Sequence, residues 1–345
     1  MYLSIITPFF NAEKKSKSLL KTISKLKYYN IEFIFIDDGS TDSTYSILLD
    51  FKEKMTDLNI HLIKQENKGP GGARNSGLKV SQGKYVWFVD SDDDITTDAL
   101  DFIQENHTFD FDFIEFLEKE NLILVDSMEI KSGSYSDANQ VISVLFKNFG
   151  RIHSKIFKRE VLIKNDIYYP EYCYYEDVSL PFILPFSINK FFKTDIVGYI
   201  YNIEPSSITN SPLTLRTLDR LYSLQYGFEK GCSLTNNQIE IDLIKQKFLK
   251  HFLFRSVEVF RKKTPHVQWI TTWRIMKNYR ELASHYNISI NPLVFLGNKE
   301  INPTYDYKFK LYFYFHWFIS FFIFKEQNTY FKKIRKAAWP ALNSN

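Results

Sequence analysis

The chain has 345 residues, of which 44% are hydrophobic and 17% aromatic, with a formal net charge of +4. This length and apolar content allow one large domain or two smaller ones, and they exclude a globally disordered protein. The weak net charge gives no support for a nucleic-acid partner, and we expect none. The two cysteines, Cys173 and Cys232, match no metal-binding spacing and suggest no disulfide framework, so we expect a reducing, cytoplasmic compartment.

The N-terminal segment is the first predicted element. It lacks a basic n-region and breaks at Pro8, so we interpret it as a buried strand rather than a signal peptide. No apolar run reaches the roughly 20 residues that a membrane-spanning helix needs. The nearest candidate, residues 311–324, is shorter and is interrupted by His316 and Ser320.

The first third of the chain alternates short apolar runs with polar segments of helical spacing. We predict strands over residues 3–7, 32–37, 60–64 and 85–90, and helices over 13–27, 42–55 and 73–81. This alternation is typical of βαβ units, and it predicts an α/β fold with a Rossmann-like, mainly parallel sheet flanked by helices. In such sheets ligands bind beyond the carboxyl ends of the strands.

The remaining chain changes character twice. Further strands are predicted over residues 111–116, 122–125, 153–157 and 199–201, with a helix over 138–146. Helices then follow over residues 214–227, 238–261 and 267–286. Because residues 204–212 hold two prolines among several polar residues, we place a boundary there, between a domain of residues 1–205 and a helical region of residues 206–345.

Four polar motifs follow the four predicted strands of the first third. They occupy residues 8–11, 37–42, 69–75 and 90–94. One such motif would be weak evidence, because aspartates often cap helices and glycines often serve turns. Four in order at successive strand ends indicate a binding site at one edge of the sheet.

The last of these motifs predicts a metal site. Asp90 and Asp92 can present carboxylate oxygens to one Mg²⁺ or Mn²⁺, with phosphate oxygens completing the shell. Such a cation would stop carboxylates from repelling a nucleotide diphosphate and would neutralise charge on the departing diphosphate. Asp93 and Asp94 could instead cap the helix that begins near Thr97, and this alternative stays open.

The other motifs suggest nucleotide contacts. The Asp38 carboxylate can accept a hydrogen bond from a base N–H or a ribose hydroxyl, and Phe10 either packs on the base or belongs to the core. The Gly-Pro-Gly-Gly loop opens a helix, whose free N–H groups favour anions. Arg74 in the first turn is unfavourable for the helix dipole, which suggests an anionic or nucleotide partner.

Together the motifs Asp-Asp-Gly-Ser-x-Asp, Gly-x-Ala-Arg-Asn-x-Gly and Asp-Ser-Asp-Asp resemble those of the family 2 glycosyltransferases. The resemblance covers about residues 2–201 and is most specific over residues 4–95. It implies a GT-A fold, a nucleotide-sugar donor, Mg²⁺ or Mn²⁺ as cofactor, and inversion of the anomeric centre. The implied donor site consists of Pro8, Phe10, Asp38, Arg74, Asp90, Ser91 and Asp92, with Asp90 and Asp92 also binding the metal. Residues 1–95 would form the nucleotide-sugar half of the catalytic domain and residues 96–205 the acceptor half.

The family also places its catalytic base in a downstream Glu-Asp pair at the start of a helix, and Asp177 matches that base. Inverting transfer needs one group to take the acceptor's proton, which a carboxylate can do, although a plain helix N-cap is the alternative. The segment from His153 to Glu160 is similar to the family's basic segment before the base, with His153 near the place of a common tryptophan. We expect His153, Lys155 and Glu176 at the acceptor, although His153 could equally be structural.

Residues 308–336 alternate aromatic and basic side chains. This pattern fits an in-plane anchor on an anionic membrane, which would place the protein peripherally on the inner face of the cell membrane. A buried helix or a homo-oligomer contact fits it as well.

These observations predict an inverting glycosyltransferase. It would transfer sugar from a UDP-sugar to a hydroxyl of a glycan or lipid-linked glycan, in synthesis of a surface polysaccharide such as capsule or lipopolysaccharide. A catalytically silent, nucleotide-sugar-binding homologue and a sugar nucleotidyltransferase are the alternatives. The intact Asp90, Asp92 and Asp177 disfavour the first, and a nucleotidyltransferase needs no Glu-Asp pair so far downstream.

Overall fold

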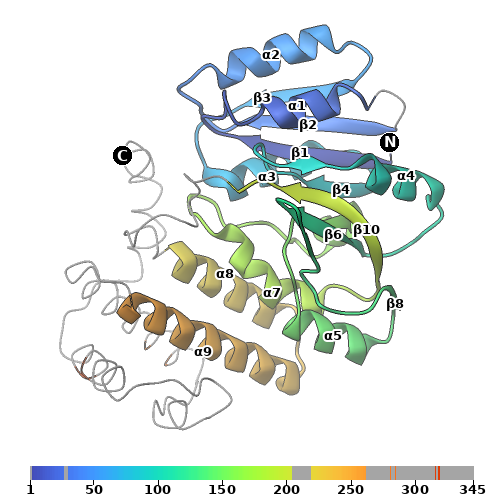
Figure 1. The fold of residues 1–345 in the computed structure, drawn as a ribbon. Coiled ribbons are helices and arrows are strands. Elements are labelled where there is room, and N and C mark those ends of the chain that lie inside the picture. The colour runs from blue at the N-terminus through green and yellow to red at the C-terminus, as the bar shows by residue number, and fades with distance from the viewer. Residues whose placement is uncertain are drawn as a thin grey trace.

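The computed structural model describes residues 2–26, 30–203 and 219–261, together with the isolated positions 280, 284, 315 and 318. Its first four strands are β1 (Leu3–Phe9), β2 (Ile31–Asp37), β3 (Asn59–Lys64) and β4 (Tyr85–Phe88). They lie in the order β3-β2-β1-β4, and all three pairs are parallel. The helices α1 (Lys17–Ile23), α2 (Thr44–Lys54) and α3 (Gly69–Val80) connect them, as the βαβ pattern predicts (Figure 1).

The second half of the sheet is mixed. Beyond β4 come β9 (Lys155–Lys158), β6 (Phe113–Glu120), β10 (Phe191–Tyr201) and β5 (Asp94–Ile95), while β7 (Ile123–Val125) pairs with β6 and β8 (Gly133–Tyr135) pairs with β10. β9 is antiparallel to both β4 and β6, and β5 is antiparallel to β10, whereas β10 and β6 are parallel. The predicted α/β architecture is therefore confirmed, and in the N-terminal half of the sheet every strand pair is parallel.

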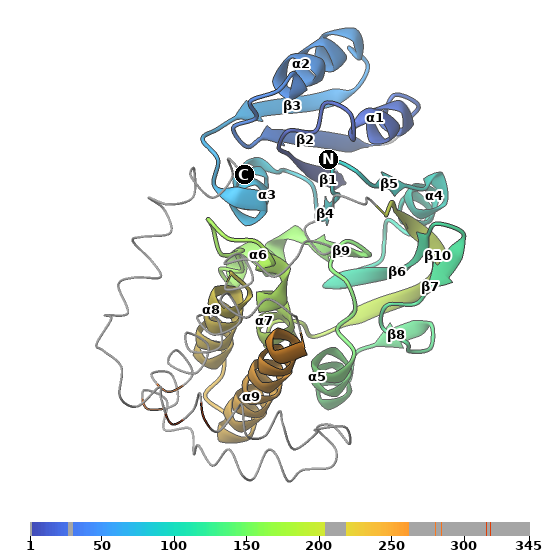
Figure 2. The same cartoon turned by 60° about the vertical axis from the view of Figure 1, so that its left-hand side comes forward.

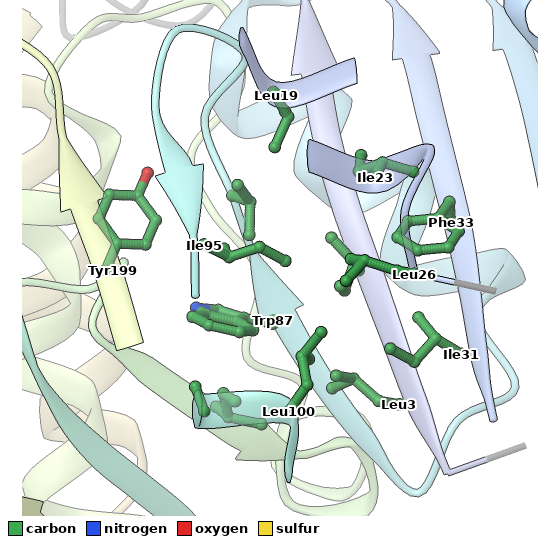
Figure 3. Packing of buried hydrophobic residues seen from close by; sticks show 14 of the residues in the cluster. Leu3, Leu19, Ile23, Leu26, Ile31, Phe33, Trp87, Ile95, Leu100 and Tyr199 are labelled. Carbon is green, nitrogen blue, oxygen red and sulfur yellow. The ribbon is translucent and has the colours of Figure 1, made fainter. Parts of the chain in front are cut away.

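Hydrophobic residues cover both faces of this sheet. On one face, side chains of β1, β2 and β4 pack against α1, α2 and α4 (Thr97–Glu105). Figure 3 shows part of this cluster, in which Leu19 and Ile23 of α1 and Leu100 of α4 surround Trp87 and Ile95. On the other face pack α3, α5 (Ala138–Lys147) and α7 (Leu180–Ile183). Because side chains alternate along a strand, both sides of β2 are buried, as expected of a central parallel strand.

Several elements differ from the predicted bounds. α3 begins at Gly69, four residues early, because Pro70 is well tolerated in a first helical turn. β10 begins at Phe191 rather than near residue 199, since pairing with β6 and β8 supports its polar middle. α9 (Gln238–Arg261) has the predicted bounds. The boundary at residues 204–212, most of the helix at 267–286 and nearly all of segment 308–336 lie outside the described residues.

The C-terminal helices pack beside the acceptor half. A short 3₁₀ turn, η1 (Glu176–Ser179), leads into α7, and α6 (Arg159–Lys164) precedes them. α8 (Asp219–Ser233) packs on η1 and α7, and α9 packs on α8 (Figures 1 and 2). Within the described part of the chain, no helix combines the length and the apolarity needed to cross a membrane. Neither Cys173 nor Cys232 is part of a disulfide bond in the described part of the chain.

Candidate active site

The four motifs meet at one cleft with a volume of about 420 Å³, a size typical of small-molecule sites. It lies beyond the carboxyl ends of β1, β2 and β4, next to the first turn of α3 and to η1. The candidate residues that line it are Pro8, Phe10, Asp38, Arg74, Asp90, Ser91, Asp92, His153, Glu176 and Asp177. The structure therefore brings the donor candidates, the metal candidates and the candidate base into one space.

Asp38 and Phe10 occupy the β1–β2 edge of the cleft. Asp38 is buried, and its Oδ1 accepts hydrogen bonds from Gln65 Nε2 at 2.7 Å and from the Lys68 backbone N–H at 2.9 Å. Burial raises the pKa of Asp38 to about 6, although these hydrogen bonds lower it. The Phe10 side chain is 36% exposed, so Phe10 is not a core residue and its ring is available to a ligand.

Arg74 joins two of the motifs to the Glu-Asp pair. Its Nη2 contacts Asp90 Oδ1 at 2.5 Å and its Nη1 bonds to Glu176 Oε1. Burial alone would lower the pKa of the guanidinium, but the charges of Asp90 and Glu176 raise it well above its ordinary value. The cation expected to face a nucleotide thus holds two carboxylates of the same cleft in place.

The turn after β4 is fixed by the end of β10. Tyr199 Oη accepts from the Asp90 N–H at 3.2 Å and donates to Asp93 Oδ2 at 2.6 Å. Asn202 donates its N–H to Asp93 Oδ1 and its side-chain amide to the carbonyl of Asp92, both at 2.9 Å. Burial raises the pKa of Asp93 to about 8. These contacts orient the turn that carries Asp90 and Asp92.

The helix-cap interpretation of Asp93 and Asp94 is wrong. Thr96 caps α4 by accepting a hydrogen bond from the Ala99 N–H at 3.3 Å. Asp94 instead accepts hydrogen bonds from Thr22 Oγ1, at 2.8 Å, and from Ser18, so it ties the first helix to the sheet. The Asp93 N–H bonds back to the Asp90 carbonyl at 3.2 Å, so the chain turns over residues 90–93, and the carboxylates of Asp93 and Asp94 bond to other elements than α4.

The metal-binding candidates fit a hard divalent cation. Asp90 and Asp92 both line the cleft, and the Asp90 side chain is 35% exposed despite its bond to Arg74. Among the described residues, no group of three or more side chains forms a protein-only metal site. Two carboxylates leave most coordination positions to phosphate and water oxygens, an arrangement that Mg²⁺ commonly adopts.

The Glu-Asp pair follows a left-handed residue, since Tyr175 has a φ of +60° and forms the N-cap of η1. Glu176 is buried against Arg74; burial raises its pKa to about 7, with Arg74 acting in the opposite direction. Asp177 is exposed and lines the cleft. Since Tyr175 is the N-cap, the interpretation of Asp177 as a plain cap is wrong, and Asp177 is the member of the pair presented to a ligand.

The two basic candidates for acceptor binding, His153 and Lys155, lie in different environments. His153 lines the cleft, stacks on Tyr199 with ring centroids 4.4 Å apart, and contacts Glu118 Oε2 at 3.1 Å. Lys155 does not line the cleft: its side chain is fully buried, and its Nζ lies 2.8 Å from Glu115 Oε2. The expectation that Lys155 contacts the acceptor is therefore not supported, because its ammonium pairs with the buried carboxylate of Glu115 in β6.

Several other residues line the cleft but were not predicted from the sequence. They include Lys15, Asn67, Tyr174, Tyr201 and Asn202. Tyr174 is adjacent to the Glu-Asp motif, and that proximity alone could have drawn attention to it. Lys15, Tyr201 and Asn202 belong to no motif, and only the tertiary fold brings them to the cleft.

The fold is of the GT-A type, with the cleft at the carboxyl ends of its parallel strands. A family model described as glycosyl transferase family 2 matches residues 4–114 of this chain. The match covers the first three strands, β4 and the whole Asp90–Asp94 turn. This agrees with the family resemblance seen in the sequence.

Individual proteins that this chain resembles are also glycosyltransferases. The chain is 31% identical over 179 residues to a poly(ribitol-phosphate) β-N-acetylglucosaminyltransferase, TarS, of Staphylococcus aureus, covering 50% of this chain and 30% of that protein. It is 28% identical over 178 residues to a poly(ribitol-phosphate) β-glucosyltransferase of Bacillus spizizenii, covering 49% and 27%. A solved structure of S. aureus TarS residues 1–349 with UDP-GlcNAc superimposes with a TM-score of 0.61 at 25% identity, over 81% of each chain. The chain thus spans less than half the length of these curated relatives.

Proposed function

We propose that this chain transfers a sugar from a UDP-sugar to a hydroxyl of a surface glycan, with inversion at the anomeric carbon. The observation that carries the proposal is that a single cleft joins the nucleotide-side residues Asp38, Arg74 and Asp90 to an exposed carboxylate, Asp177. Uridine is supported by the similar TarS structure, which was solved with UDP-GlcNAc. The TarS relative also supports a β-linked product.

The donor half of the cleft supplies binding. Asp38 has one oxygen fixed by Gln65 and Lys68, and the carboxylate can accept from the base or the ribose while Phe10 packs on the base. Asp90 and Asp92 would hold Mg²⁺ or Mn²⁺, which when bound neutralises charge on the departing diphosphate. Arg74 keeps Asp90 aimed at the cleft.

Asp177 supplies the proton acceptor. In the transfer, the acceptor oxygen forms a bond to the anomeric carbon, the bond from that carbon to the diphosphate oxygen breaks, and Asp177 takes the hydroxyl proton. Attack from the face opposite the diphosphate inverts the configuration. Glu176 is less suited to this role, because its carboxylate is buried and bonded to Arg74.

The acceptor we propose is a polyol-phosphate polymer or a related lipid-linked glycan. Two relatives are described as acting on poly(ribitol-phosphate), which favours a cell-wall polymer over lipopolysaccharide. We also propose a peripheral location on the inner face of the cell membrane. The aromatic and basic composition of residues 308–336 supports this location.

A donor screen tests the proposal. Purified protein with Mn²⁺ is incubated with UDP-GlcNAc, UDP-glucose, GDP-mannose or CTP plus a sugar phosphate, with and without poly(ribitol phosphate), and released nucleotide is measured. UDP release that rises with acceptor, together with a β-configured product by NMR, is the expected result. Pyrophosphate release from CTP would instead indicate a nucleotidyltransferase, and donor binding without turnover would indicate a silent homologue.

A further inference from the structure

The catalytic turn has a strained backbone. Tyr175 has a φ of +60° directly before Glu176, and Tyr172 has a φ of +57°. Side chains other than glycine disfavour this left-handed region, and such residues persist only where the surrounding structure holds them. The position of Asp177, two residues after Tyr175, therefore depends on the contacts that hold the turn.

Residues in and beside the third motif, Lys68 and Arg74, hold one side of the turn. The Lys68 carbonyl accepts a hydrogen bond from the Tyr172 N–H at 2.6 Å, and Arg74 of α3 bonds to the Glu176 carboxylate. These contacts fix the start of the turn and the Glu176 side chain. Neither contact involves the backbone between Tyr174 and Glu176.

Helix α8 holds the other side. Asp219 Oδ2 accepts a hydrogen bond from the Tyr174 N–H at 3.0 Å, and Ser223 Oγ donates to the Glu176 carbonyl at 3.1 Å. The side chains of Asp219 and Ser223 are both buried. Buried hydrogen bonds of this kind are costly to break, so they fix the Cys173–Tyr174 and Glu176–Asp177 peptide groups, which enclose the left-handed Tyr175.

The spacing of the contact residues along α8 places them on one face of the helix. Asp219, Ser223 and Gly227 are four residues apart and lie on one side of the helix. A Cβ at Gly227 would lie 2.5 Å from the Ser179 carbonyl oxygen, so only glycine allows this approach. The Arg220 guanidinium lies 3.9 Å from the centroid of the Tyr175 ring. Figure 2 shows α8 running beside α7, and α8 also contacts η1.

We propose that Asp219 and Ser223 are positioning residues for sugar transfer. They fix the peptide groups around Tyr175 so that the Asp177 carboxylate points to the acceptor hydroxyl. Neither residue lines the cleft, so they act through the turn and not on the substrate. Both lie outside residues 4–114, the part that matches the family model. The inference rests on the proposed function, because it concerns Asp177 as the proton acceptor.

A pair of substitutions at Asp219 tests this directly. Asp219→Ala removes the acceptor of the Tyr174 N–H, whereas Asp219→Asn keeps a side-chain oxygen in its place. With UDP-GlcNAc, poly(ribitol phosphate) and Mn²⁺, UDP release is measured to obtain kcat and KM, and calorimetry gives the affinity for UDP. Since a displacement of 1 Å can cost about 10²-fold in rate, Asp219→Ala should lower kcat at least about 10-fold. KM for the donor and UDP affinity should stay within about twofold of wild type, and Asp219→Asn should recover most of kcat.

Two further variants separate positioning from stability. Ser223→Ala removes the second hydrogen bond but leaves the Glu176 carbonyl bonded to Ser179 Oγ at 2.7 Å, so the protein should fold and lose kcat several-fold. Phe228→Ala loosens α8 on its other side, where the Phe228 ring packs on Phe248 with centroids 4.8 Å apart. This control should lower the melting temperature and leave kcat per folded molecule unchanged.

The outcomes are distinct. Wild-type kcat in the folded Ser223→Ala variant, or an equal loss of kcat in Phe228→Ala, overturns the positioning role while the proposed function stands. If Asp219→Ala does not fold, Ser223→Ala decides. A wild-type protein that turns over no nucleotide sugar refutes the proposed function and this inference with it.

Discussion

Removing Arg74 should destabilise the protein in a way that depends on pH. The Arg74 side chain is 6% exposed and its partner Glu176 is 8% exposed, whereas Asp90 is 35% exposed. Breaking a buried ion pair typically costs about 3–5 kcal/mol, and a partly exposed pair adds less than about 1 kcal/mol. We therefore expect Arg74→Ala to lower the free energy of unfolding by about 3–5 kcal/mol at pH 8, mostly through Glu176.

The pH dependence follows from the protonation of Glu176. Its pKa in the folded protein is about 7, above the ordinary value, so its favourable contribution is present at low pH and is lost as pH rises through 7. Without Arg74, which lowers this pKa, the pKa rises further, and the variant gains more from protonation than the wild type does. The loss caused by Arg74→Ala should therefore be smaller at pH 6 than at pH 8, with a slope of at most about 1.4 kcal/mol per pH unit.

Urea unfolding at pH 6 and pH 8 provides the assay, with equal m-values required before free energies are compared. Arg74→Ala is also made in the Glu176→Gln background, where the charge that Arg74 neutralises is absent. We expect a smaller loss there, because the two substitutions remove the same interaction. A loss below about 1 kcal/mol at pH 8, or an equal loss in both backgrounds, would refute the reasoning.

Four further predictions concern activity and location. Asp177→Asn should lower kcat about 10²–10⁴-fold with little change in UDP affinity, and a near-wild-type rate would make Glu176 the candidate base. Chelation with EDTA should abolish turnover and Mn²⁺ should restore it; full activity after thorough chelation contradicts a metal at Asp90 and Asp92. Tyr199→Phe should raise the Mn²⁺ concentration needed for half-maximal activity several-fold, because it frees the Asp90 turn, and an unchanged requirement argues against that coupling. Full-length protein should co-sediment with anionic vesicles in a salt-sensitive way, and a chain ending at residue 303 should not; equal sedimentation of both refutes the anchor.

The location of the site could be predicted because it depends on chain order. Parallel strands joined by helices bring their carboxyl ends to one edge, so Asp38 and Asp90 had to lie near each other once the βαβ pattern was recognised. Glycine, proline and aspartate in the connecting loops are local signals that a sequence displays directly. The Glu-Asp pair at residues 176–177 was found through the family resemblance.

The partners of these residues could not be predicted. The bond between Arg74 and Glu176 joins positions 102 residues apart, and that between Tyr199 and Asp93 joins positions 106 apart. No local pattern distinguishes an aspartate that caps a helix from one that accepts a bond from a distant tyrosine. Likewise, the sequence around Lys155 does not show whether this lysine binds an acceptor or pairs with Glu115 inside the fold.

Because α8 packs on η1, the contacts around η1 can form only after α8 has been synthesised. Residues up to Asp94, with all the nucleotide motifs, leave the ribosome first, and the Glu-Asp turn follows at residues 176–177. The helix that closes this turn begins only at Asp219, about 40 residues later. A nascent chain can therefore form the sheet edge that carries the four motifs while the turn at residues 176–177 still lacks its contacts with α8. Since α8 also packs on α7, folding of α8 and completion of the contacts around residues 176–177 are coupled.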